Sequence, residues 1–109
     1  MGLSYRVEQK FDDCRDILPL PFDFYIPELN MVIEADGEQH FRPTRFGNQT
    51  DEEARVAFEI LKKHDAMKNE YCASSGIYLL RIPYWKRKTA NVIIANAVAS
   101  ILDNKEKTA

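Results

Sequence analysis

Two short β-rich runs joined by a four-residue turn constrain the fold of this chain more than any other feature. Phe22–Ile26 (FDFYI) and Met31–Ala35 (MVIEA) are rich in the aromatic and β-branched residues that favour strands. Pro27–Asn30 between them is a turn signal. Because so short a connection joins neighbouring antiparallel strands, the sequence predicts a β-hairpin in which Ile26 faces Met31.

That register brings acidic residues together. Asp23 should lie directly opposite Glu34, and because side chains alternate along a strand, both carboxylates should point to one face, followed on it by Asp36. Like charges opposite each other destabilise a sheet by roughly several tenths of a kcal/mol. Mg²⁺ or Mn²⁺ would offset this repulsion, so Asp23, Glu34 and Asp36 are the predicted metal ligands. The alternative is an acidic edge that faces solvent and tolerates the repulsion.

Two further strands are indicated by their residue patterns. Tyr5–Phe11 (YRVEQKF) alternates apolar and polar residues, which is typical of a half-buried strand, and residues 12–21 are expected to form a connector. Ile77–Ile82 (IYLLRI) is nearly continuously apolar, which predicts a strand buried on both faces. The apolar side chains of the hairpin are expected to fill the face opposite the carboxylates: Phe22, Phe24, Ile26, Met31, Ile33 and Ala35.

Two helices complete the pattern. A long helix is predicted over residues 51–75, entered through Thr50 with acidic residues in its first turn and closed by Gly76. Thr89 is expected to cap a final helix that runs through about Leu102. The order β-β-β-α-β-α favours an α/β fold with a central mixed four-stranded sheet and flanking helices.

The length and composition favour one intracellular domain. The 109 residues suffice for a single domain, taken as residues 1–109. No stretch approaches the roughly 20 apolar residues that span a bilayer, and the N-terminus lacks the pattern of a signal peptide. Cys14 and Cys72 are too few for a disulfide framework. We therefore expect a cytoplasmic protein with no membrane partner.

The net charge of −2 is unusual for a protein that binds nucleic acid. Acidic helix faces and a carboxylate site can nevertheless hide a local basic surface. The residues predicted to contact nucleic acid are Gln39, Arg42, Arg45, Lys86, Arg87 and Lys88. For Lys86–Lys88 alone, a solvated basic loop is the competing interpretation.

Several short motifs follow one another in an order that is specific as a set. Leu20–Tyr25 (LPFDFY) precedes Glu34–His40 (EADGEQH), and Asp65 with Lys68–Cys72 (KNEYC) precedes Leu79–Tyr84 (LLRIPY). Together they resemble the PD-(D/E)XK nuclease superfamily, in the branch around very-short-patch repair endonucleases and phage EDxHD homing-type nucleases. The first two motifs are similar to the two active-site strands of that branch, and the others to the helix and strand that follow.

The resemblance implies a restriction-endonuclease-like core and a Mg²⁺- or Mn²⁺-dependent endonuclease that hydrolyses DNA phosphodiester bonds with activated water, in a bacterial or phage-infected cell. Asp23 would be the main metal ligand and Glu34 a second one, directly or through water. Asp36 and His40 would position the attacking water, or His40 would act as general acid or base. Double-stranded DNA is the implied partner, with specificity supplied by a homodimer partner or by a fused or separate recognition module.

The chain departs from the family pattern in two places. The lysine usual two residues after the second acidic residue is replaced by Asp36. The branch also tends to have a leading helix that contributes a glutamate, which is expected to be absent here, and Glu8 is not assigned to replace it. These departures favour a second interpretation, a catalytically impaired DNA-binding or interaction module that retains the nuclease fold. A hydrolase of smaller phosphate esters is a third.

The long helix offers a substitute for the missing lysine. On a helical projection, His64 and Lys68 fall within the apolar arc, and Asp65 lies at its edge. Charged groups that face a core are destabilising unless they are paired, so this face is expected to look onto the active-site end of the sheet. Lys68 could stabilise charge on the phosphate and Asp65 could orient Lys68 or His40. Alternatively, Lys68 snorkels to the helix edge and His64 is a satisfied interior imidazole.

Overall fold

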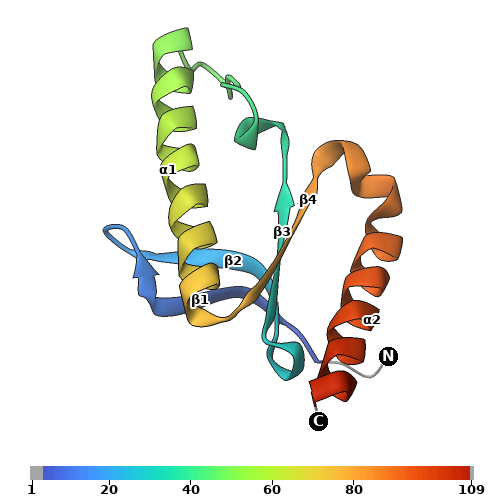
Figure 1. Cartoon of the computed structure of the whole chain (residues 1–109). Helices are drawn as coiled ribbons and strands as arrows, with labels where there is room; N and C mark the ends of the chain where they lie inside the picture. Colours follow the sequence, from blue (N-terminus) through green and yellow to red (C-terminus); the bar gives the residue numbers. More distant parts are fainter. Residues whose placement is uncertain (1–3, 109) are drawn as a thin grey trace.

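The computed structural model describes residues 4–108 and confirms the predicted α/β class, with a four-stranded mixed sheet and two long helices (Figure 1). The predicted element order β-β-β-α-β-α is also confirmed. Short 3-10 turns follow β2, β3 and β4. The bounds are β1 Arg6–Arg15, β2 Pro19–Ile26, β3 Met31–Asp36, α1 Asp51–Ser75, β4 Tyr78–Pro83 and α2 Ala90–Thr108.

The sheet has the strand order β1-β2-β3-β4. β1 with β2 and β2 with β3 are antiparallel pairs, whereas β3 and β4 run parallel. A parallel pair cannot be joined by a tight turn, and α1 supplies the crossover between these two strands. The carboxyl ends of β3 and β4 therefore lie at the same edge of the sheet, next to the loop that leads into α1 (Figure 1).

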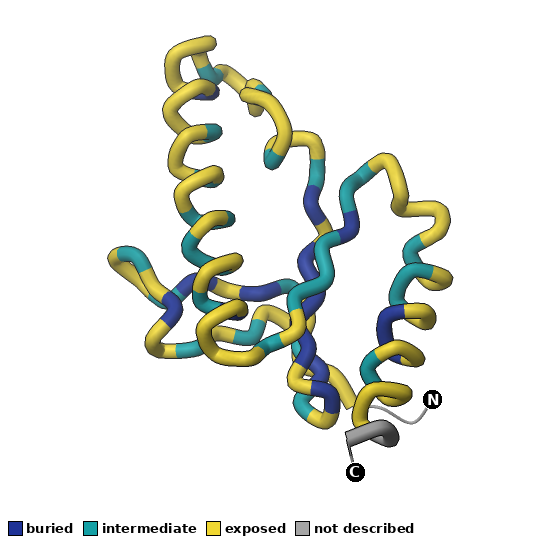
Figure 2. Tube along the Cα trace, in the orientation of Figure 1, coloured by how far each residue is buried: buried dark blue, intermediate teal, exposed yellow. Residues whose placement is uncertain are grey.

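The two helices pack on opposite faces of the sheet. Met31 and Ile33 belong to a buried cluster with Val98 of α2, while Val32 belongs to a second cluster with Cys72 of α1. These alternating residues of β3 point to opposite faces, so each helix has a core of its own. Buried residues concentrate along β3 and the neighbouring part of β2, whereas the N-terminal half of α1 is mostly exposed (Figure 2).

The predicted boundaries of α1 are confirmed, and its caps explain them. Thr50 accepts a hydrogen bond from the Glu53 amide, and the Glu53 carboxylate accepts one from the Thr50 amide, which forms a capping box. Gly76 ends the helix with φ 70°, a left-handed conformation that glycine adopts without strain. Among the described residues, no helix is long and apolar enough to cross a membrane.

Several details differ from the sequence-based expectations. β1 extends to Arg15 and pairs with β2, so residues 12–21 are mostly strand rather than connector. β4 is an edge strand, and for this reason Tyr78 remains 45% exposed instead of being buried. α2 continues past Leu102 to Thr108. Phe22 is buried with the α1-side cluster rather than with Ile26, because β2 and β3 diverge beyond Phe24. Phe24, which was also expected in the core, is 36% exposed.

Candidate functional site

The hairpin has the predicted register, with Ile26 across from Met31, and the paired residues end at Phe24 and Ile33. Beyond that point, hydrogen bonds that involve side chains join the two strands in place of backbone–backbone hydrogen bonds. The Asp23 carboxylate accepts a hydrogen bond from the Ala35 amide (2.7 Å), and the Asp23 amide donates to Glu34 Oε2 (3.3 Å). Asp23 and Glu34 are thus side by side, as the register predicted, at the place where the strands separate.

Glu34 is a buried carboxylate with a lysine partner. Its residue is only 4% exposed, and Lys68 Nζ lies 2.5 Å from its Oε1. Burial is the largest influence and raises the pKa of the Glu34 carboxyl; Lys68 opposes the shift and Asp23 adds to it. The Lys68 ammonium also lies 5.2 Å from the ring centroid of Phe22. The inward position predicted for Lys68 is therefore confirmed.

Asp36 is paired with Arg81, which was not among the site residues predicted from the sequence. Arg81 Nη1 lies 3.0 and 3.1 Å from the two carboxylate oxygens of Asp36. The same guanidinium donates to Asn69 Oδ1 (2.9 Å) and to the main-chain carbonyl of Asp65 (3.2 Å). Arg81 therefore ties β3, β4 and α1 together. The available signal was a single charged residue within the apolar run IYLLRI.

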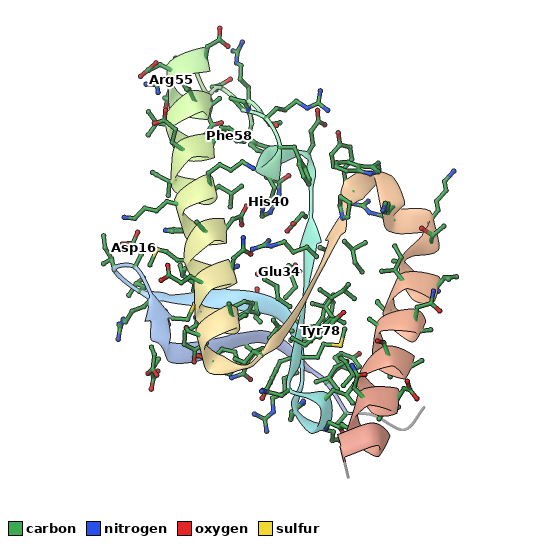
Figure 3. The ribbon with its side chains drawn as sticks, in the orientation of Figure 1. Asp16, Glu34, His40, Arg55, Phe58 and Tyr78 are labelled. Carbon is green, nitrogen blue, oxygen red and sulfur yellow. The ribbon has the colours of Figure 1, made fainter. Side chains whose placement is uncertain are left out.

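His40 meets a carboxylate of α1. It lies in a single 3-10 turn, Glu38–His40, directly after β3. His40 Nδ1 is 3.0 and 3.2 Å from the two carboxylate oxygens of Asp65, and 3.7 Å from Asp36 Oδ1. Of the two roles predicted for Asp65, the geometry matches orientation of His40. Glu34 and His40 both lie between α1 and the sheet (Figure 3).

Glu34, Asp36 and Asp65 thus each have a basic neighbour, and the predicted cluster of three carboxylates is not assembled. Among the side chains that the structure describes, no group of three or more histidine, cysteine, aspartate or glutamate residues is arranged so that it could hold a metal ion. Asp23 and Glu34 stand together, whereas Asp36 is held by Arg81. Any cation site here would therefore depend on two carboxylates rather than three.

A row of ionisable residues crosses the sheet through Asp23 and Glu34. The register of β1 with β2 puts Glu8 across from Asp23, and β3 pairs with β4 through Glu34 and Arg81. Glu8 has φ 52°, a left-handed conformation that residues other than glycine rarely adopt. In this row β1, β2 and β3 each carry an acidic residue, and β4 carries Arg81.

His64, whose role the sequence left open, lies elsewhere. Its Nε2 is 3.1 Å from Asp16 Oδ2, in the turn between β1 and β2. Lys63 approaches the same carboxylate at 3.3 Å, and these two partners lower the pKa of Asp16. The His64–Asp16 contact matches the interpretation of a satisfied structural imidazole.

The predicted DNA-contacting residues are exposed but are not all in one place. Arg42 donates to the Tyr84 hydroxyl (2.7 Å) and pairs with Glu38 (3.2 Å), which joins the segment after β3 to the segment after β4. Lys86–Lys88 belong to that second segment. By contrast, Arg45 contacts the Gln49 carbonyl (2.8 Å) and Asp51 (3.6 Å) at the start of α1. Gln39 lies beside His40 in the 3-10 turn.

Comparison with family models, with curated proteins and with solved structures gives no match. The resemblance to the PD-(D/E)XK nucleases therefore rests on the motifs of this chain alone.

Proposed function

We propose that the chain is a metal-dependent endonuclease that hydrolyses DNA phosphodiester bonds with activated water. The observation that carries the proposal is the contact between Lys68 and Glu34 beside Asp23. The motif resemblance calls for two acidic residues and a lysine in one site, and the strand position expected for the lysine holds Asp36. Lys68 reaches the Glu34 carboxylate from α1 instead and supplies the missing positive charge.

The donor chemistry of Asp23 and Glu34 fits a divalent cation. Mg²⁺ prefers one or two carboxylates, completed by water and substrate phosphate oxygens. Asp23 is half-buried, and its charge adds to the burial that raises the pKa of the Glu34 carboxyl, so the pair carries repulsion that a cation would relieve. A bound cation would supply charge stabilisation to the phosphate and acidity to a water. Asp36 is left to orient other groups, since Arg81 holds both of its oxygens.

The remaining polar residues have separate tasks in this proposal. Lys68 stabilises negative charge on the phosphate oxygens as the bond to water forms. His40 is held through Nδ1 by Asp65, which leaves Nε2 as the nitrogen that exchanges a proton during the reaction. Arg81 keeps Asp36 and the Asp65 main chain in place around His40.

The DNA backbone is proposed to lie along the segments that follow β3 and β4. Arg42 and Lys86–Lys88 are exposed there and would contact phosphates. Gln39 precedes the proposed general acid or base by one residue, so it would contact the same stretch of DNA. Arg45 lies at the other end of the α1 entry loop and would contact DNA farther from the cleavage point.

One observation favours the second interpretation, an inactive module with the nuclease fold. Glu34 and Asp36 already have basic partners in Lys68 and Arg81, and an internally neutralised site can be stable with no metal. The exposed basic residues would then serve DNA binding alone.

Cleavage of supercoiled plasmid separates the two interpretations. The chain is incubated with Mg²⁺ or Mn²⁺, beside a sample with EDTA. The enzyme predicts nicked plasmid with metal and none with EDTA, and it predicts loss of nicking in Asp23→Asn. Asp16→Asn is the matched control, because Asp16 is a carboxylate in a surface turn that should leave cleavage unchanged. No nicking with either metal, or equal nicking by Asp23→Asn, would refute the enzyme and leave the binding module.

A further inference from the structure

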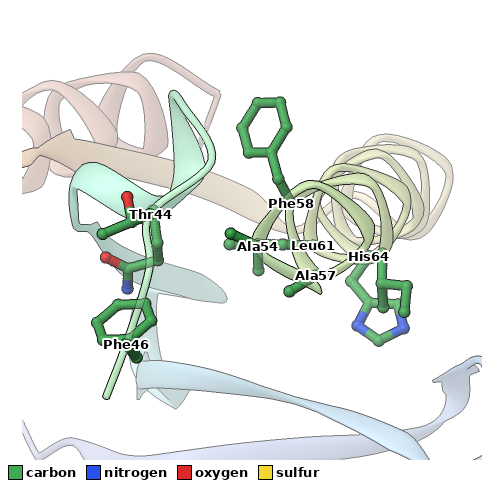
Figure 4. A pocket seen from close by; sticks show the side chains of 9 residues that line it. Thr44, Phe46, Ala54, Ala57, Phe58, Leu61 and His64 are labelled. Carbon is green, nitrogen blue, oxygen red and sulfur yellow. The ribbon is translucent and has the colours of Figure 1, made fainter. Parts of the chain in front are cut away.

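An apolar hollow lies between α1 and the loop that follows β3. Its volume is about 360 Å³, and its lining is mostly apolar, with Phe46, Ala54, Ala57, Phe58 and Leu61. Gln39, Thr44 and His64 are its polar lining residues. Phe46 stands across the hollow from the helix (Figure 4). Its side chain remains 59% exposed, so this surface presents apolar area to the solvent.

A second hollow of about 460 Å³ adjoins the first. Its lining includes the turn between β1 and β2, where Ile17 is 88% exposed and Leu18 is 71% exposed. Both hollows are also lined by Ile60 and His64, so they meet on the same side of α1. We call Ile17, Leu18, Phe46, Ala57 and Ile60 the apolar α1 face.

The elongated shape of the chain is consistent with burial of the apolar α1 face by another molecule. Its radius of gyration is 15.7 Å, whereas a compact domain of this length has about 13 Å. The N-terminal half of α1 extends beyond the sheet and is mostly exposed (Figure 2).

We propose that a second copy of the chain covers the apolar α1 face, with the two α1 helices antiparallel about a two-fold axis near Ala57 and Ile60. Along α1, the hollow extends over residues 54–64, while the protruding turn of Ile17 and Leu18 lies beside residues 60–64. A two-fold rotation reverses the direction of the helix. The protruding turn of each copy then meets the hollow of the other, which is the self-complementarity that such an interface requires.

The charges along this side of the helix also favour the antiparallel pair. Glu53, Ala57, Ile60 and Lys63 follow one another at helical spacing, with the acid near the N-terminal end and the base toward the middle. Reversal about Ala57 and Ile60 brings Glu53 of one copy to Lys63 of the other, whereas a parallel pair would oppose like charges. The existing contact of Lys63 with Asp16 is exposed, at 3.3 Å, and leaves Lys63 able to take part.

Sedimentation of the full chain, without DNA or metal, tests the proposal. The expected mass is about 25 kDa, twice 12.6 kDa. Ile60→Lys puts a charge at the centre of the interface and should sediment at 12.6 kDa. Val92→Lys is the matched control, since Val92 is 60% exposed on α2 and should leave the dimer intact. Circular dichroism checks that both variants fold. A monomeric wild-type chain, or a folded Ile60→Lys variant that remains dimeric, overturns the proposal.

Site-directed cross-linking tests which face of α1 lies in the interface. Ala57 and Ala66 are both exposed on α1, and their separation of nine residues puts them about 180° apart around the helix. A bismaleimide reagent should join Ala57→Cys chains into covalent dimers and leave Ala66→Cys chains single. The native Cys14 and Cys72 are buried and serve as the background in both variants. Equal or reversed yields would show that the interface is not on the apolar α1 face and would overturn the proposal. Asp23→Asn should dimerise normally, so failure of the dimer and failure of the nuclease proposal are separate results.

Discussion

Lys68 Nζ on α1 lies 2.5 Å from Glu34 Oε1 on β3, which joins a helix and a strand through a buried ion pair. The lysine side chain is 13% exposed and the glutamate side chain 5% exposed. Because each charge has little access to water, removal of one leaves the other poorly solvated. The contact thus connects the stability of the fold with the chemistry proposed for the site.

Lys68→Met should lower the free energy of unfolding by about 3 kcal/mol, because it strands the buried Glu34 carboxylate. Urea denaturation at pH 7 measures the change. The double variant Glu34→Gln with Lys68→Met contains neither charge and should recover most of the loss. A double variant as unstable as Lys68→Met would show that packing, rather than the stranded charge, is responsible.

The stability contributed by Glu34 should depend on pH in a defined direction. Burial raises the pKa of its carboxyl in the folded chain above the ordinary value of about 4.3. Between these two pKa values the folded state binds more protons than the unfolded chain, so stability falls as the pH rises through the window. Measured in EDTA, wild type should therefore gain stability relative to Glu34→Gln as the pH is lowered toward about 4.3. A difference that is constant, or that grows with increasing pH, would contradict the raised pKa.

Arg81→Lys should lower the cleavage rate by roughly 10–100-fold while leaving the affinity for DNA unchanged, as expected for a residue that acts through its neighbours. A lysine cannot reach Asp36, Asn69 and the Asp65 carbonyl together as the guanidinium does. Single-turnover rates and DNA binding in EDTA separate the two effects. A parallel loss of affinity would instead make Arg81 a direct DNA contact.

The exposed basic residues after β4 should control the salt dependence of DNA binding. Lys86→Gln, Arg87→Gln and Lys88→Gln should each reduce the slope of log affinity against log salt by about 0.9 per lost phosphate contact. Fluorescence anisotropy with duplex DNA in EDTA measures the slope without cleavage. Lys10→Gln, an exposed lysine of β1, is the control and should leave the slope unchanged. Equal slopes in all four variants would place the DNA elsewhere.

Local signals explain why much of this architecture was predictable. The short connection at Pro27–Asn30 left one natural register for the hairpin, and that register placed Asp23 beside Glu34. Thr50 and Gly76 marked the ends of α1 through capping chemistry that is encoded within a few residues.

Non-local contacts explain what the sequence did not predict. Arg81 and Asp36 are 45 residues apart in the sequence, and their pairing depends on the register of the parallel strands β3 and β4. The packing of α1 sets that register, whereas a turn sets the register of a hairpin. The charge of Arg81 within an apolar run marks the residue as unusual, but its neighbours in the sequence do not identify Asp36 as its partner. Phe22 likewise changes face because β2 separates from β3 beyond Phe24, which alternation along an ideal strand does not anticipate.

The single-turnover cleavage rate of Lys68→Met with saturating Mg²⁺ tests the central claim most directly. The variant is compared with wild type and with Asp16→Asn, at a temperature where circular dichroism shows all three folded. If Lys68 supplies the positive charge of the site, Lys68→Met should be slower by roughly 100-fold or more, as when one group that stabilises the transition state is removed. Asp16→Asn should cleave at the wild-type rate. Cleavage by folded Lys68→Met at the wild-type rate would contradict the account.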